Sequence, residues 1–178
     1  IEQTFDKNFD NTSDITAIVN EKNFNRLTEL IKENKIIYGG KSDRENRYIF
    51  PTIIDSPKMD SNIMKEEIFG PILPVLSFEK LEDIDNIINK NPNPLALYVF
   101  SNNKKFTETV INRYSFGGGS INDTIVHLAN SRLPFGGVGN SGIGSYHGKL
   151  SFELFSHKKS IVNRSTWFDN NLRYAPYK

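Results

Sequence analysis

The chain has 178 residues, of which 37% are hydrophobic and 24% are charged, enough for one soluble domain with a sizeable core. Its 22 Lys and Arg nearly balance 21 Asp and Glu, and the net charge of +1 argues against binding nucleic acid or an anionic membrane through a broad basic field. The chain has no cysteine, which excludes disulfide bonds and thiolate metal ligands. Its three histidines are scattered, so we expect no metal site.

The sequence carries no sign of a membrane segment or a secretion signal. No stretch is both long and apolar enough to cross a bilayer. Residues 1–6 lack the basic start and the apolar core of a signal peptide, so we expect a cytoplasmic protein. Because the chain starts at Ile1 without an initiator methionine, we also expect it to be a piece of a longer polypeptide.

The first predicted elements are a helix and three strands. Residues 20–34 carry apolar side chains at helical spacing, which predicts an amphipathic helix. A short strand is expected at 35–38, and a second extended run rich in β-branched residues covers 48–54. The apolar run 72–78 predicts a buried strand, in which Pro74 requires a local break.

Helices and strands then alternate along the chain. Residues 80–90 and 103–114 predict amphipathic helices, and the apolar run 95–100 predicts a core strand. Residues 117–122 begin another extended segment. Strands that alternate with helices indicate βαβ units. We therefore predict an α/β fold, with an open, largely parallel twisted sheet flanked by helices.

A glycine-rich run follows at residues 133–148, which read LPFGGVGNSGIGSYHG. Glycines among apolar and aromatic residues predict a tightly bent, packed loop, because the turns would be blocked by a Cβ. Residues 137–142 match the pattern GxGxxG, which indicates a dinucleotide site only between a strand and a helix. Here Leu133-Pro134-Phe135-Gly136 precedes the pattern and further glycines follow it, so we reject that interpretation.

Together with this run, other segments give the sequence a family resemblance. These segments are Glu66-Glu67-Ile68-Phe69-Gly70-Pro71, Pro94-Leu95-Ala96-Leu97-Tyr98, Asn122-Asp123 with Val126-His127, and Ser151-Phe152-Glu153. The sequence resembles the C-terminal part of the catalytic domain of aldehyde dehydrogenases, closest to the class 3 type, over nearly its whole length. The resemblance implies that residues 1–155 belong to that domain and that 156–178 form a bridging or oligomerisation strand and tail.

The family oxidises aldehydes to carboxylic acids with NAD or NADP, through a cysteine thiolate and a glutamate base. This chain has no cysteine, and it lacks the glycine-flanked glutamate segment of the family. The resemblance therefore implies a fragment without catalytic residues of its own, inactive alone, whose nucleophile, base and dinucleotide-binding domain lie elsewhere. The alternative is a free-standing, non-catalytic module that keeps the fold for oligomerisation or for binding a partner.

The resemblance also assigns roles to individual residues. Glu67 would accept hydrogen bonds from the hydroxyls of the nicotinamide ribose, since its two oxygens can accept from both at once. Phe69 would pack beside the nicotinamide. The ordinary interpretation of Glu67 is a surface acid, and that of Phe69 is a core phenylalanine. Glu66 has no assigned role, and we expect it to face solvent.

Three further residues are candidates for the wall of a substrate tunnel: Asn122, which could instead hydrogen-bond the active-site backbone, His127 and Phe135. A satisfied, partly buried Asn or His is the alternative interpretation. The alternation of polar and apolar residues over 156–164 is typical of an exposed strand, and the resemblance implies that it pairs with a neighbouring subunit in a homodimer.

Overall fold

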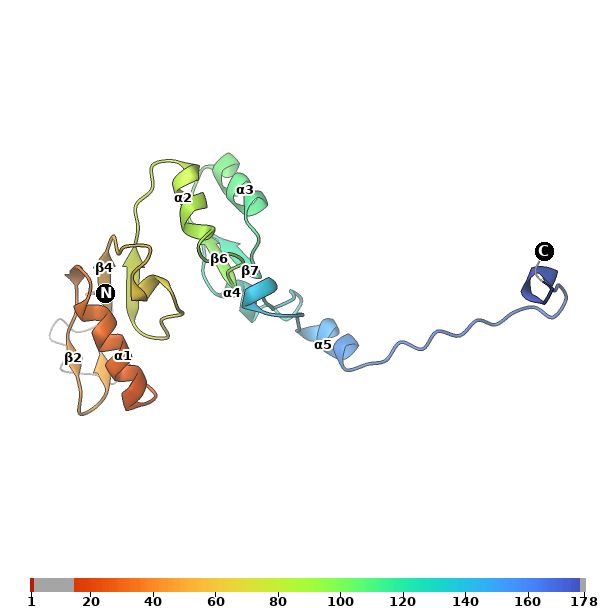
Figure 1. Ribbon diagram of the computed structural model, residues 1–178, viewed down its shortest axis with the longest axis horizontal. Helices are drawn as coiled ribbons and strands as arrows, with labels where there is room; N and C mark the ends of the chain where they lie inside the picture. Colours follow the sequence, from red (N-terminus) through yellow and green to blue (C-terminus); the bar gives the residue numbers. More distant parts are fainter. Residues whose placement is uncertain (2–14, 177–178) are drawn as a thin grey trace. The chain divides into compact units, whose positions relative to one another are not determined.

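The computed structural model describes Ile1 and residues 15–176 of the chain (Figure 1). The chain divides into two compact units, Ile1–Pro92 and Asn93–Lys178. The predicted division between residues 155 and 156 stays a prediction. Among the described residues, no helix combines the length and the apolar composition that crossing a membrane requires.

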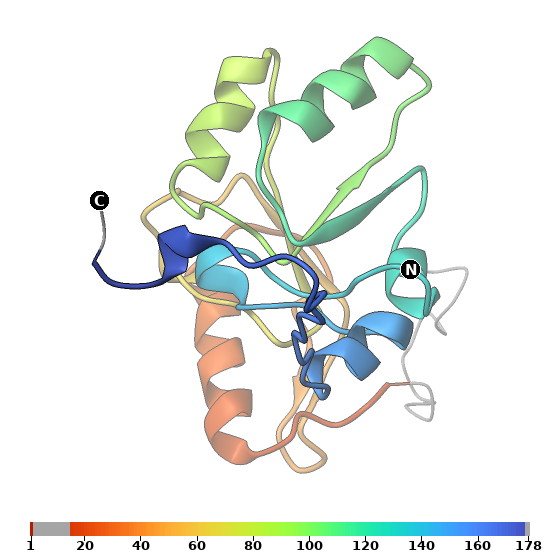
Figure 2. The same ribbon diagram turned by 90° about the vertical axis from the view of Figure 1, so that its right-hand side faces the viewer.

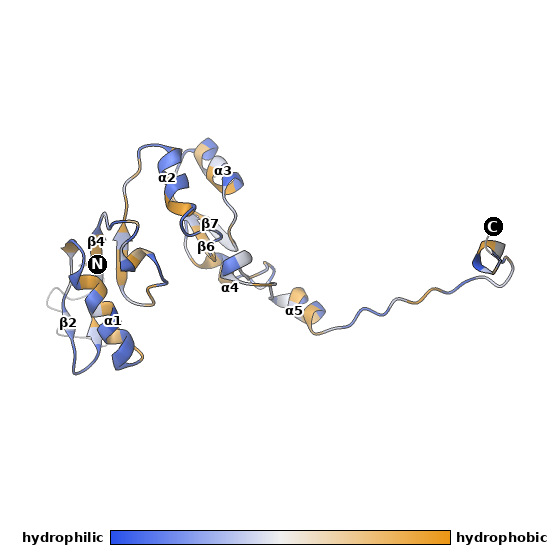
Figure 3. Cartoon of the chain, viewed as in Figure 1, coloured by the Kyte–Doolittle hydropathy of each residue, from blue (hydrophilic) through white to orange (hydrophobic). Residues whose placement is uncertain are grey.

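The first unit is built on the helix α1, Glu21–Lys32, as predicted from residues 20–34. It begins after Asn20, whose side-chain oxygen accepts a hydrogen bond from the backbone N–H of Asn23 and so satisfies one of the free donors of the first turn. Figure 3 shows apolar and hydrophilic stretches side by side along this helix. Its apolar residues are buried: Phe24, Leu27, Leu30 and Ile31.

These side chains pack against a three-stranded sheet with the order β1-β4-β5. Strand β1, Ile36–Tyr38, runs antiparallel to β4, Thr52–Asp55, and β4 runs parallel to β5, Ile72–Val75. Because Pro74 lies on an edge strand, it is accommodated opposite Ile54 within the ladder. The predicted local break is therefore wrong, and the strand is only half buried because alternate side chains face outward.

Short elements complete the first unit. Strands β2, Ser42–Asp43, and β3, Tyr48–Ile49, form an antiparallel hairpin, so the predicted run 48–54 is two strands. A 3-10 helix, η2, covers Asn62–Met64, and the helix α2 covers Leu81–Ile88. The core of the unit joins α1 to the strands and η2: Ile18, Phe24, Leu27, Leu30, Ile31, Ile49, Ile54, Ile63 and Ile72.

The second unit contains the βαβ arrangement that the sequence predicted. Strand β6, Ala96–Val99, leads to the helix α3, Lys104–Arg113, and then to β7, Gly118–Ile121, which pairs with β6 in parallel (Figure 2). Helix α3 begins after Asn103, whose side-chain oxygen accepts from the backbone N–H of Phe106.

After β7 the chain forms short elements around the glycine-rich run. These are the helix α4, Val126–Ala129, the 3-10 helix η3, Gly139–Ser141, the helix α5, Gly148–Leu154, and the 3-10 helix η4, Asn171–Arg173. Between them, Phe135 and Tyr146 form an antiparallel bridge with two backbone hydrogen bonds of 2.9 Å. This bridge closes the predicted loop at its base.

One expectation about strands needs correction, and a second is not tested by a single chain. The described residues form three separate small sheets, one of them mixed, in place of one largely parallel sheet. The predicted strand at 156–164 stays a prediction: no described strand pairs with this segment, and Ile161 and Val162 are 78% and 88% exposed. An extended segment becomes a strand only when its backbone groups pair with a neighbour, and no described residue pairs with this one.

Candidate functional site

A groove in the first unit brings together the first predicted site residues. It lies between the segment 15–19, the beginning of α1, and the loop 66–71 that leads into β5. Its volume is about 950 Å³, and both Glu67 and Phe69 line it. The fold places these side chains here because the loop contacts α1, through Gly70 and the carbonyl of Ile68, just before the chain enters β5.

Glu67 has an exposed carboxylate that makes no hydrogen bond or ion pair with any described residue. Its neighbour Glu66 behaves differently, because its Oε1 lies 3.0 Å from Nη1 of Arg26 in α1. Glu66 is exposed, as expected, and the pairing with Arg26 was not predicted. Both oxygens of Glu67 remain available to accept hydrogen bonds from a ligand in the groove.

Phe69 is not a core residue, since 76% of its surface is exposed. Its backbone φ is 49°, in the left-handed region that bulky residues rarely adopt. The next residue, Gly70, lies against α1 so closely that a Cβ there would come within 2.7 Å of the Leu27 side chain. The glycine lets the loop approach the helix, and the positive φ turns the phenyl ring outward.

The arrangement fits one end of a dinucleotide. A free carboxylate suits a ribose with two neighbouring hydroxyls, and an exposed phenyl ring beside it suits a flat heteroaromatic ring. Among the described residues there is no cluster of three or more His, Asp or Glu side chains able to hold a metal ion.

Asn122, in the second unit, is used within the fold. Its side-chain oxygen accepts from the backbone N–H of Ser101 at 2.8 Å, and its side-chain amide donates to the Ser101 carbonyl at 3.2 Å. Ser101 follows β6 and Asn122 follows β7, so this pair of bonds extends the parallel pairing beyond the last residues of the two strands.

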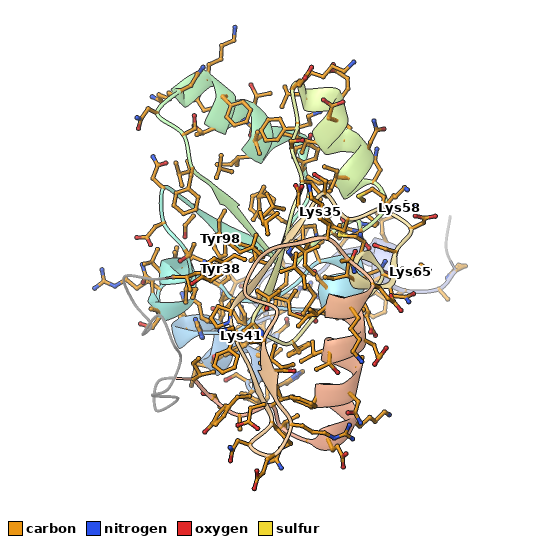
Figure 4. All side chains as sticks on the ribbon, turned by 90° about the vertical axis from the view of Figure 1, so that its left-hand side faces the viewer. Lys35, Tyr38, Lys41, Lys58, Lys65 and Tyr98 are labelled. Carbon is orange, nitrogen blue, oxygen red and sulfur yellow. The ribbon has the colours of Figure 1, made fainter. Side chains whose placement is uncertain are left out.

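His127 and Phe135 lie together in an aromatic cluster of the second unit. His127 is only 7% exposed, and its ring centroid lies 5.7 Å from that of Tyr98 and 6.3 Å from that of Phe135. The cluster continues through Tyr146 and His147, whose centroids are 5.7 and 5.9 Å from Phe135. Tyr98, labelled in Figure 4, belongs to strand β6. Neither ring nitrogen of His127 has a hydrogen-bond partner among the residues that the structure describes.

Sequence reasoning missed two features of these sites. The pairing of Arg26 with the loop joins residues 40 and 42 positions apart, and no local pattern signals it. The aromatic cluster was not predicted: His127 and Phe135 were named only as separate candidates for the tunnel wall, and Tyr146 and His147 were not connected to them. The rejection of a dinucleotide fingerprint at 137–142 agrees with the structure, where no β-strand immediately precedes these described residues and no α-helix immediately follows them.

The pattern of the aldehyde dehydrogenase family matches residues 2–161 of the chain. The chain belongs to the aldehyde dehydrogenase family. Members of this family are oxidoreductases that act on aldehydes.

Among relatives, the chain is 48% identical to the 4,4'-diaponeurosporen-aldehyde dehydrogenase of Staphylococcus aureus, covering 100% of the chain and 39% of the relative. It is 49% identical to aldehyde dehydrogenase family 3 member H1 of Arabidopsis thaliana, covering 99% and 37%. It is 47% identical to the "dimeric NADP-preferring" aldehyde dehydrogenase of Mus musculus, covering 92% and 36%. The predicted class 3 resemblance is confirmed, and the chain spans between 36% and 39% of the length of these relatives.

Solved structures give the same result for the fold. The substrate-bound state of Staphylococcus aureus AldH superposes with a TM-score of 0.89 at 48% identity, covering 99% of this chain and 39% of that one. The NAD+ complex of Mycobacterium tuberculosis aldehyde dehydrogenase superposes with a TM-score of 0.75 at 26% identity, covering 87% and 33%. The α/β fold of the family, with mixed and parallel sheets, is therefore confirmed for this aldehyde dehydrogenase chain.

Proposed function

We propose that the chain is the C-terminal part of the catalytic domain of an NAD(P)-dependent aldehyde dehydrogenase that oxidises aldehydes to carboxylic acids. The observation that carries this proposal is the free, exposed carboxylate of Glu67 on a groove, held in a loop that is fastened to α1. Family membership and relatives bound to NAD+ or named NADP-preferring support it.

In the complete enzyme, Glu67 accepts hydrogen bonds from the hydroxyls of the nicotinamide ribose, and Phe69 packs beside the nicotinamide. NAD or NADP, when bound, supplies the hydride acceptor of the reaction. The two side chains fix where the ring lies relative to the substrate, and the rate of transfer depends steeply on that geometry. Their role is orientation, since the rest of a dinucleotide is held by other parts of the enzyme.

The remaining machinery lies outside this sequence in the proposal. The chain has no cysteine to serve as the nucleophile, so it shows no dehydrogenase turnover alone. On the substrate side, the aromatic cluster around His127 and Phe135 contributes to the wall of the tunnel that admits the aldehyde. Asn122 supports that wall by holding the ends of β6 and β7 together.

The segment after residue 155 serves dimerisation in this proposal. Ile161 and Val162 are largely exposed, and their backbone groups have no strand partner among the described residues. Exposed apolar residues on an unpaired extended segment favour the addition of this segment to a sheet of another subunit. The mouse relative is named as dimeric, which agrees with a homodimer.

Glu67→Gln in the complete enzyme tests the proposal. The amide keeps one acceptor oxygen but loses the charge, and losing a charge-assisted hydrogen bond is worth about 1.5–3 kcal/mol. Single-turnover hydride transfer should therefore slow about 10- to 100-fold, with a smaller change in the dissociation constant of the cofactor. Glu45→Gln is the control, because Glu45 is also exposed and lies outside the groove.

Two outcomes would contradict the proposal in different ways. Hydride transfer that is unchanged in the Glu67→Gln enzyme would refute the contact with the ribose. Dehydrogenase turnover by the purified 178-residue chain, its sequence verified by mass, would refute the assignment of the nucleophile to another part of the polypeptide.

A further inference from the structure

Arg26 connects α1 to the loop that carries Glu67 and Phe69. Its Nη2 donates to the carbonyl oxygen of Ile68 at 2.6 Å, and its Nη1 donates to Oε1 of Glu66 at 3.0 Å. The side chain is 26% exposed, so these bonds are partly shielded from water. The planar guanidinium binds a carbonyl and a carboxylate at once, which a lysine cannot do with the same geometry.

The carbonyl that Arg26 binds belongs to the residue before Phe69, so this bond bears on the φ angle of Phe69. The carbonyl is part of the peptide group between Ile68 and Phe69, and rotation about φ of Phe69 turns this group relative to the phenyl ring. A φ of 49° is unfavourable for a phenylalanine by about 1–2 kcal/mol. Such a conformation persists only where surrounding contacts hold it. The bond from Arg26 opposes the rotation that would return Phe69 to an ordinary conformation.

The two adjacent glutamates divide the charges of the loop between them. Glu66 neutralises the guanidinium of Arg26, and Glu67 has no cationic partner among the described residues. Since Arg26 also lines the groove, an unpaired guanidinium there would compete with a ligand for the Glu67 carboxylate. The pairing with Glu66 therefore keeps Glu67 available.

We propose that Arg26 is a positioning residue for the cofactor contact, acting through the Ile68 carbonyl on Phe69 and through Glu66 on Glu67. This inference rests on the proposed function for the identity of the ligand. The grip of Arg26 on the loop is a property of this chain by itself, and it is measurable without cofactor.

The first experiment follows the loop in the cofactor-free complete enzyme. Hydrogen–deuterium exchange of the amides at 66–70 should be several-fold faster in Arg26→Gln than in the wild type, because the loop opens more often. Arg44→Gln is the matched control: Arg44 pairs with Glu21 of the same helix at 2.7 Å, but both side chains are exposed and neither lines the groove. Exchange at 66–70 that is equal in both variants would overturn the proposal.

The second experiment is a double-mutant cycle on single-turnover hydride transfer. Arg26→Gln alone should slow transfer about tenfold, which corresponds to about 1.4 kcal/mol. In the Glu67→Gln background the same substitution should have a clearly smaller effect, because both residues then act through one contact. Fully additive effects would overturn the positioning role, because they are what a general loss of stability would produce.

Further variants keep the outcomes separable. If Arg26→Gln does not fold, Arg26→Lys takes its place, because lysine retains the charge and most of the stem of the side chain. Exchange at 66–70 in Arg26→Lys should be faster than in the wild type and in Arg44→Gln. Wild-type exchange in Arg26→Lys would overturn the need for two bonds. Fast exchange in an Arg26 variant, combined with a silent Glu67→Gln, would refute the ribose contact and uphold the grip of Arg26 on the loop.

Discussion

The conformation of Phe69 predicts that a Gly variant is more stable than an Ala variant at this position, the reverse of the usual order. The residue has a φ of 49° and is 76% exposed, so Gly and Ala substitutions both remove the same mostly exposed ring. They differ in the backbone: Ala keeps a left-handed strain of about 1–2 kcal/mol, and Gly relieves it. Gly in turn makes the unfolded chain more flexible, which costs about 0.4–1 kcal/mol. Phe69→Gly should therefore be more stable than Phe69→Ala by about 1 kcal/mol.

Urea unfolding of the complete enzyme measures this difference, with Lys65 as the matched control position. Lys65 is exposed in the same stretch, and its φ of −97° is ordinary for any residue. At Lys65 the order should reverse, with Ala more stable than Gly by about 0.5–1 kcal/mol. If Ala is as stable as Gly or more stable at Phe69, the left-handed conformation does not hold and the reasoning about the loop is refuted.

Two further predictions concern α2 and the C-terminal segment. The backbone N–H groups of Glu79 and Lys80 donate to the Asp83 carboxylate and hold the pKa of Asp83 below its ordinary value. A lowered pKa in the folded state stabilises α2 above about pH 4. The stability difference between wild type and Asp83→Asn should thus shrink from pH 6 to 3; a constant difference would contradict it. Val162→Pro removes a backbone donor and should shift the complete enzyme toward monomer in sedimentation, whereas an unchanged dimer would exclude pairing at this position.

Local patterns predicted the parts of the fold that local physics determines. The helical spacing in residues 20–34 identified α1 and its four buried residues, because one face of a helix must find a core. Alternation of strands and helices predicted the parallel pair β6 and β7. The family motif at 66–71 identified Glu67 and Phe69, which the structure places together on one groove.

The misses have one physical origin, which is contact between residues far apart in the sequence. Pro74 was expected to break its strand, but an edge position leaves its missing donor without consequence. Glu66 is exposed as expected, but its pairing with a guanidinium 40 residues earlier was not predicted. No periodicity records such a pairing, because a single Arg on the polar side of a helix resembles any solvated charge.

The segment 156–164 shows that a sequence pattern also cannot record contacts with another chain. Its alternating pattern was enough to predict an exposed strand, since each face of a strand repeats every second residue. Whether the strand forms depends on a partner edge, and the described residues offer none. In our proposal, the segment 156–164 becomes a strand only by pairing with another subunit, whereas the Glu67 loop awaits only a ligand. The loop differs in being prepared in advance, because Arg26 and Gly70 already fix its conformation on α1.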